Sequence, residues 1–144
     1  MALSPIIALS LIATFVGLSL IHAYWGLGGR VGLLAAIPEV DGKPAFQPSV
    51  LATLVVAIGL ALCAVVIAST AGILTLPLPR TVSVWLTRAL ALVLLLRAIG
   101  DFRLVGFLKR IRHTRFARLD SAVYSPLCLV LAVGSAAVSF GEHG

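Results

Sequence analysis

The chain has 144 residues, of which 60% are hydrophobic and only 11% are charged, and its mean hydropathy is +1.14. A soluble domain of this length cannot bury so large an apolar fraction, so these values exclude an ordinary water-soluble protein. The net charge of +6 would suit nucleic acid as well as a membrane surface. Because the basic residues gather in short loops beside apolar blocks, we expect no nucleic-acid partner.

The first two membrane spans are predicted from blocks without charged residues. Residues 1–29 hold no Asp, Glu, Lys or Arg, which places a first span at about 5–27. This block lacks the basic start and the clear cleavage site of a secretory signal, so we expect a permanent span. Residues 44–79 are also free of such charges, and their apolar centre predicts a second span at about 50–71.

The third span must carry charge into the membrane. Only eight residues separate Arg88 from Arg97, which is about 12 Å of helix. We place this helix at about 82–108, with Trp85 near one interface and Arg88 reaching towards it. A last apolar block predicts a fourth span at about 122–140. The fold class is therefore an all-α integral membrane four-helix bundle, because lone strands would leave their backbone unpaired in lipid.

Basic residues are distributed unequally between the two sides of such a bundle. The loops after the first and third spans carry seven: Arg30, Lys43, Lys109, Arg110, Arg112, Arg115 and Arg118. The opposite side has Arg80 and, near the interface, Arg88. The positive-inside rule then predicts that the basic loops are cytoplasmic and that both termini lie outside.

The basic loop between the third and fourth spans, residues 108–119, has two interpretations. The simpler one is that its charge only fixes the topology. The sharper one is an interfacial segment held by anionic lipid, in which each Lys or Arg contributes about 1 kcal/mol.

Ionisable residues inside the membrane are rare, and several are predicted at one level here. Arg97 and Asp101 are four residues apart, so they would share a face of the third helix and contact each other. Measured along each helix from its predicted start, Arg97 lies at roughly 22 Å, Asp101 at roughly 28 Å and His22 at roughly 25 Å. Near this level the sequence adds Tyr24, Arg103, Asp120 and Tyr124. We expect these seven residues to line a polar pocket near the cytoplasmic leaflet.

The same residues also have a purely structural interpretation. Arg97 and Asp101 could be a neutralised pair that fixes helix register, and Tyr24 with Trp25 could belong to an interfacial aromatic belt. His22 alone is more often a hydrogen-bonded core residue than a ligand.

Several chemistries are excluded. Two haem-ligating histidines are not available within the membrane, since His113 and His143 lie in a loop and at the tail. We find no metal-ligand spacing, no phosphate-binding glycine loop and no recognisable catalytic triad, so we expect no cofactor or metal. Cys63 and Cys128 lie in different spans and are expected to be buried thiols without a redox role.

Six segments together resemble one family of bacterial membrane proteins, the domain-of-unknown-function family numbered 3995. They are His22–Gly29, Ile37–Glu39, Gly42–Phe46, Arg97–Arg103, Phe116–Asp120 and Tyr124–Leu127. The resemblance covers nearly the whole chain and implies a compact four-helix membrane protein. We expect this protein in the bacterial inner membrane. It implies no activity and no catalytic residue.

Three functions remain open. The preferred hypothesis is a non-enzymatic protein whose pocket binds a small amphiphile or lipid headgroup, with Arg97 pairing an anionic group and Asp101 orienting Arg97. A second is an enzyme acting on a lipid-soluble substrate, with His22 or Asp101 exchanging protons. A third is a small transporter or assembly subunit, a homo-oligomer whose helices approach each other at Gly17, Gly59 and Gly134.

Overall fold

The computed structural model describes residues 3–141, and nearly all of its regular structure is helical. Four helices within this range are long and apolar enough to cross a membrane, which confirms the predicted fold class. They are α1 (Leu3–Gly26), α2 (Val50–Thr70), α3 (Arg80–Ile99) and a continuous run of α4 (Arg115–Leu119), the π-helical turn η2 (Asp120–Tyr124) and α5 (Ser125–Phe140). The side of the membrane on which the termini lie stays a prediction.

The connection between α1 and α2 contains the only strands among the described residues. A 3-10 turn, η1 (Leu33–Ala36), is followed by the antiparallel pair β1 (Glu39–Val40) and β2 (Lys43–Pro44). The two turn residues, Asp41 and Gly42, have φ angles of 51° and 74°. Positive φ at both positions is typical of the tight turn that matches strand twist.

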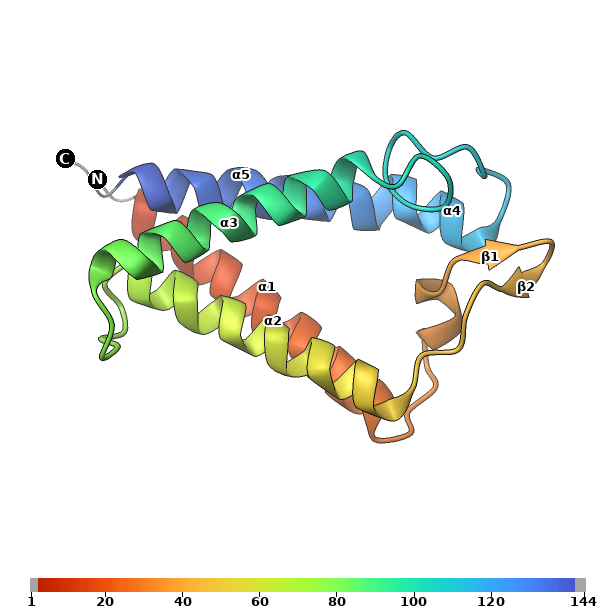
Figure 1. Cartoon of the computed structure of the whole chain (residues 1–144), viewed down its shortest axis with the longest axis horizontal. Helices are drawn as coiled ribbons and strands as arrows, with labels where there is room; N and C mark the ends of the chain where they lie inside the picture. The colour runs from red at the N-terminus through yellow and green to blue at the C-terminus, as the bar shows by residue number, and fades with distance from the viewer. Residues whose placement is uncertain (1–2, 142–144) are drawn as a thin grey trace.

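The spans form two antiparallel pairs that are splayed apart (Figure 1). Helix α1 lies along α2, and α3 lies along α5. The pairs converge where α1 begins, α5 ends and residues 71–79 lie, which we call the narrow end. They diverge towards the opposite, wide end, where η1, the β1–β2 hairpin, residues 100–114 and α4 lie.

The hydrophobic core belongs mainly to three helices. Its buried residues are Ala8, Leu11 and Phe15 of α1, Ala64 and Ile67 of α2, and Leu131 and Val138 of α5. Helix α3 is tied to α2 by hydroxyl groups instead: Thr70 bonds Thr87 over 2.7 Å and Ser69 bonds Ser83 over 3.0 Å. Such short polar side chains are common between membrane helices.

Most of the apolar surface of the spans faces outward. In the most apolar stretch of each span, only 17–33% is buried within the chain. Bulky residues such as Leu20, Leu51 and Val93 are more than half exposed. A chain with this distribution needs apolar surroundings, as a multi-pass membrane protein does.

Helix α3 ends at Ile99, whereas we expected it to continue to Leu108. Gly100 adopts φ 98° and ψ −177°, a conformation that breaks the helix and that favours glycine. The chain then folds back, because the N–H groups of Phe107 and Leu108 bond the carbonyls of Ala98 and Ile99. Residues 100–108 are therefore a folded loop.

The fourth span begins at Arg115, earlier than the predicted start near residue 122. The Thr114 hydroxyl caps it by accepting the N–H of Ala117 over 3.1 Å. The π turn lies just before Pro126, which has no N–H to donate to the helix. The Ser125 N–H bonds the Asp120 carbonyl, five residues earlier. This wide turn positions Asp120.

Candidate functional site

Asp120 is the centre of a buried polar cluster at the wide end. Its side chain is fully buried, and it accepts hydrogen bonds from Arg97 (2.7 Å) and Lys109 (2.9 Å). The Gly106 N–H (2.8 Å) and the Ser125 hydroxyl (3.1 Å) also donate to it. One carboxylate thus pairs with two cations. The Asp120 cluster is our name for the residues joined by these bonds and by the contact of Lys109 with Ser121: Arg97, Gly106, Lys109, Asp120, Ser121 and Ser125.

Lys109 is the charged member of this cluster that sequence reasoning missed, because it was counted only among the basic loop residues. Its side chain is 1% exposed. Besides Asp120, its ammonium group donates to the Gly106 carbonyl over 3.0 Å and to the Ser121 hydroxyl over 2.6 Å. A buried ammonium needs such partners, so Lys109 fastens the loop that follows α3.

Arg97 pairs with Asp120, and the expected Arg97–Asp101 pairing on one helical face does not form. The physical reason is the end of α3: beyond Gly100 the chain is no longer helical, so Asp101 leaves that face. Asp101 Oδ1 instead accepts three backbone N–H groups, from Arg103 (2.9 Å), Leu104 (2.7 Å) and Val105 (3.0 Å).

The Asp101 carboxylate therefore holds the turn after α3. Partial desolvation raises its pKa, but the backbone hydrogen bonds outweigh this, and the pKa lies below its ordinary value. Arg103 contributes its backbone to the same loop, since its carbonyl accepts the Ile111 N–H over 3.1 Å. The Arg103 side chain is exposed.

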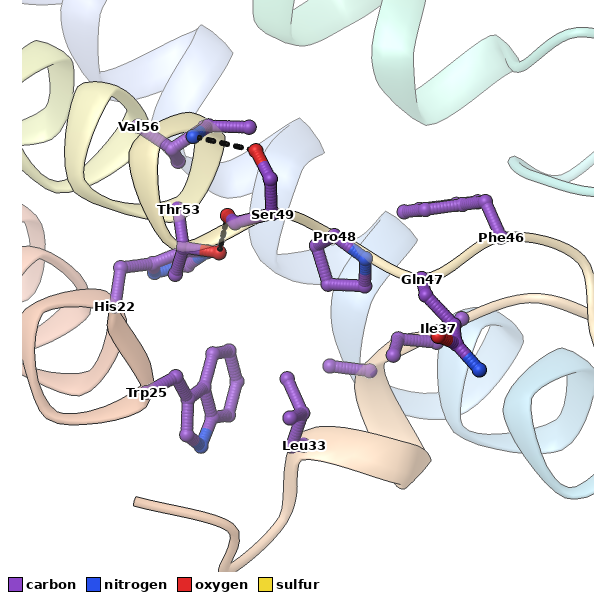
Figure 2. A pocket seen from close by; sticks show the side chains of 12 residues that line it. His22, Trp25, Leu33, Ile37, Phe46, Gln47, Pro48, Ser49, Thr53 and Val56 are labelled. Carbon is purple, nitrogen blue, oxygen red and sulfur yellow. Dashed lines mark hydrogen bonds between the residues drawn. The ribbon is translucent and has the colours of Figure 1, made fainter. Parts of the chain in front are cut away.

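His22 lines a cavity of about 530 Å³ between the wide ends of α1 and α2 and the segment that connects these helices (Figure 2). The other lining residues are Trp25, Leu33, Ala36, Ile37, Phe46, Gln47, Pro48, Ser49, Ala52, Thr53 and Val56. The walls are mostly apolar, and none of these residues carries a formal charge. We call this cavity the His22 pocket.

One ring contact and two hydrogen bonds fix the positions of His22 and Trp25 in the wall of the His22 pocket. The rings of His22 and Trp25 meet edge to face with centroids 5.1 Å apart. The Trp25 indole N–H donates to the Val31 carbonyl over 2.8 Å. His22 Nδ1 lies 2.8 Å from the Leu18 carbonyl, and because a carbonyl only accepts, this assigns the proton to Nδ1. In the neutral ring, Nε2 is then an acceptor.

The two tyrosines lie outside the His22 pocket. Tyr24 is 47% exposed, and its ring lies so close to Gly29 that a Cβ there would overlap it. The Tyr124 hydroxyl donates to the Ala35 carbonyl over 3.1 Å, and its ring lies 5.9 Å from that of Phe116. Tyr124 thus connects the fourth span to η1, whose next residue, Ala36, lines the pocket.

The seven predicted site residues are therefore divided among several places. Arg97 and Asp120 meet in the Asp120 cluster, Asp101 and Arg103 hold the loop after α3, His22 lines the pocket, and the tyrosines contact other segments. Residues 3–141 contain no group of three or more His, Cys, Asp or Glu side chains that could hold a metal. His143 lies outside the described residues.

The chain matches the model of a known protein family. No curated protein and no solved structure shows significant similarity to the chain. The model of one family matches residues 15–135, which include every member of the Asp120 cluster and the whole lining of the His22 pocket. The chain therefore belongs to the family described as Protein of unknown function (DUF3995).

Proposed function

We propose that this protein binds a small, uncharged amphiphile in the His22 pocket, as a multi-pass protein of the bacterial inner membrane. The observation that carries the proposal is the cavity of about 530 Å³. Its volume lies within the range of about 300–1,000 Å³ that is usual for small-molecule sites. Mostly apolar walls with a few polar groups are also typical of such sites.

The polar groups of the pocket favour an uncharged headgroup. The lining has no Lys, Arg, Asp or Glu, so a charged group there would lose its hydration without a partner. His22 Nε2 offers an acceptor, and it has no hydrogen-bond partner among residues 3–141. A ligand hydroxyl or amide N–H would complete it.

This proposal changes the ligand chemistry that we expected from the sequence. Arg97 was expected to bind an anionic group, but its guanidinium bonds Asp120, and it is not part of the pocket lining. We therefore assign Arg97 a role in holding the wide end together. The contact of Tyr124 with Ala35 supports the pocket from outside.

Quenching of Trp25 fluorescence tests the proposal directly. The chain has two tryptophans, so Trp85→Phe leaves Trp25 as the reporter. A brominated monoacylglycerol is titrated into the protein in detergent micelles. Saturable quenching is expected, and Ala52→Leu should abolish the saturable part by filling the pocket. Ala61→Leu is the matched control, because Ala61 lies exposed on the same helix outside the pocket.

The role of His22 is tested with a second probe. His22→Phe should weaken binding of the monoacylglycerol about fivefold, the value of one ordinary hydrogen bond. It should leave unchanged a brominated ether that has no hydroxyl group. Quenching that is linear in all variants would mean that the probe only dissolves in the micelle, and the proposal would be wrong.

A further inference from the structure

Arg88 is an ionisable residue in the apolar part of α3, far from the His22 pocket. It lies eight residues after the start of α3 at Arg80, or about 12 Å along the helix. A charge at such a depth is costly in a bilayer and usually pairs with a protein group or marks a binding site.

Arg88 has no carboxylate partner among residues 3–141. The acidic residues in this range are Glu39, Asp41, Asp101 and Asp120, and all of them belong to wide-end segments. Arg88 makes no ion pair or hydrogen bond with a described residue, and its Nε is buried without a hydrogen-bond partner. A guanidinium in apolar surroundings needs an acceptor.

Two aromatic rings hold the guanidinium in place. Its carbon lies 4.3 Å from the centroid of Phe140 and 5.1 Å from that of Trp85. Phe140 is the last residue of α5, so the side chain of Arg88 extends towards the narrow end of the bundle. This is the direction in which a long basic side chain reaches a membrane surface. Both rings are more than 60% exposed, so they also face the surroundings.

We infer that Arg88, Trp85 and Phe140 form a binding site for the phosphate group of an anionic lipid in the leaflet at the narrow end. A guanidinium can bind two phosphate oxygens at once. The rings retain the cation by cation–π contact and offer an apolar wall to the first part of the acyl chains. This inference is independent of the His22 pocket, since it involves a different end of the molecule and an anionic ligand.

Trp85 is a reporter placed within this site. In a Trp25→Phe background, we would reconstitute the protein into phosphatidylcholine vesicles that hold a minor fraction of brominated phosphatidylglycerol or, separately, of brominated phosphatidylcholine. The anionic lipid should quench Trp85 more strongly at equal mole fraction, with a local preference of about fivefold. Arg88→Gln should reduce the preference to about one, whereas Arg88→Lys should retain part of it.

Two controls separate this site from general attraction. Arg110→Gln removes one charge from the exposed loop at the wide end, and the preference should persist. Inorganic phosphate should not reduce the preference more than chloride at equal ionic strength; if it did, the site would take free phosphate and the lipid assignment would be wrong. An equal preference in Arg88→Gln, or none in the parent protein, would overturn the inference.

Discussion

The two arginines of α3 stand in opposite environments. Arg97, near the wide end, bonds the fully buried carboxylate of Asp120. Arg88, towards the narrow end, contacts two exposed aromatic rings and no described carboxylate. Similar cations, nine positions apart on one helix, thus serve different purposes: one holds the fold together, and the other is available to a ligand.

The difference extends to the two ends of the bundle. At the narrow end the helices meet in a hydrophobic core and through short hydroxyl contacts. At the wide end the two pairs are apart. There η1 and β1 contact α4 and Tyr124 across the gap, and Asp120 and Asp101 hold the loop between α3 and α4. An uncharged pocket can lie at the basic end of the molecule because the nearby cations are engaged elsewhere or point outward.

The largest expected effect comes from Asp120→Ala. This change leaves Lys109 buried without its carboxylate, which destabilises a protein by about 3–5 kcal/mol. Arg88→Ala should lose less than about 1 kcal/mol, since it removes only cation–π contacts. Thermal unfolding in detergent checks both variants side by side, and equal losses would contradict the comparison.

Gly106→Ala is expected to have the next largest effect. Gly106 has a φ of 87°, and a Cβ there would overlap the backbone of Gly100. The loss of stability should be about 2–4 kcal/mol, from the left-handed conformation and the overlap together. Gly42→Ala, in a turn with φ 74° and no neighbouring atom within 4 Å, should lose only about 1–2 kcal/mol. The melting temperatures of the two variants should therefore be in that order.

Thr87→Val tests the narrow end, and its effect should be smaller. It removes the 2.7 Å hydrogen bond to Thr70, and such bonds between membrane helices contribute about 0.6 kcal/mol on average and at most about 1.7 kcal/mol. A double-mutant cycle with Thr70→Val measures the coupling. A coupling energy as large as the loss of stability expected for Asp120→Ala would mean that both ends are held in the same way.

The smallest effect is a local response of the loop after α3 to acid. Because its backbone hydrogen bonds keep the pKa of Asp101 below the ordinary 3.8, the stabilisation is present above that value. It is lost as the pH falls through the lower, folded-state pKa. Amide exchange at Leu104, corrected for its intrinsic rate, should accelerate below about pH 4. Asp101→Asn should remove this pH dependence, and an unchanged profile would contradict the role of Asp101.

The sequence predicts the four membrane-crossing helices well, because the thickness of a bilayer demands long blocks without charge. It predicts the end of α3 poorly. Phe102, Leu104 and Val105 continue the apolar pattern past the real end, although Gly100 followed by Asp101 is a helix-stop signal that could have been used.

The partners of Asp120 could not be predicted from spacing. Arg97 and Lys109 lie 23 and 11 residues away from it along the chain, and the π turn and the folded loop bring them together. The His22 pocket depends likewise on η1 and residues 46–49 returning to the ends of α1 and α2. Helical periodicity says nothing about such loops. It therefore placed the candidate residues at about one level without revealing which of them meet.

The measurement that tests the account most directly compares the two single-tryptophan proteins with the same three brominated lipids, in the same vesicles. Trp25 should respond saturably to uncharged monoacylglycerol and show no preference for phosphatidylglycerol over phosphatidylcholine. Trp85 should be quenched more strongly by phosphatidylglycerol than by phosphatidylcholine, and its response to the monoacylglycerol should not saturate. If both tryptophans respond alike to all three lipids, the two ends do not differ in ligand chemistry, and the account is wrong.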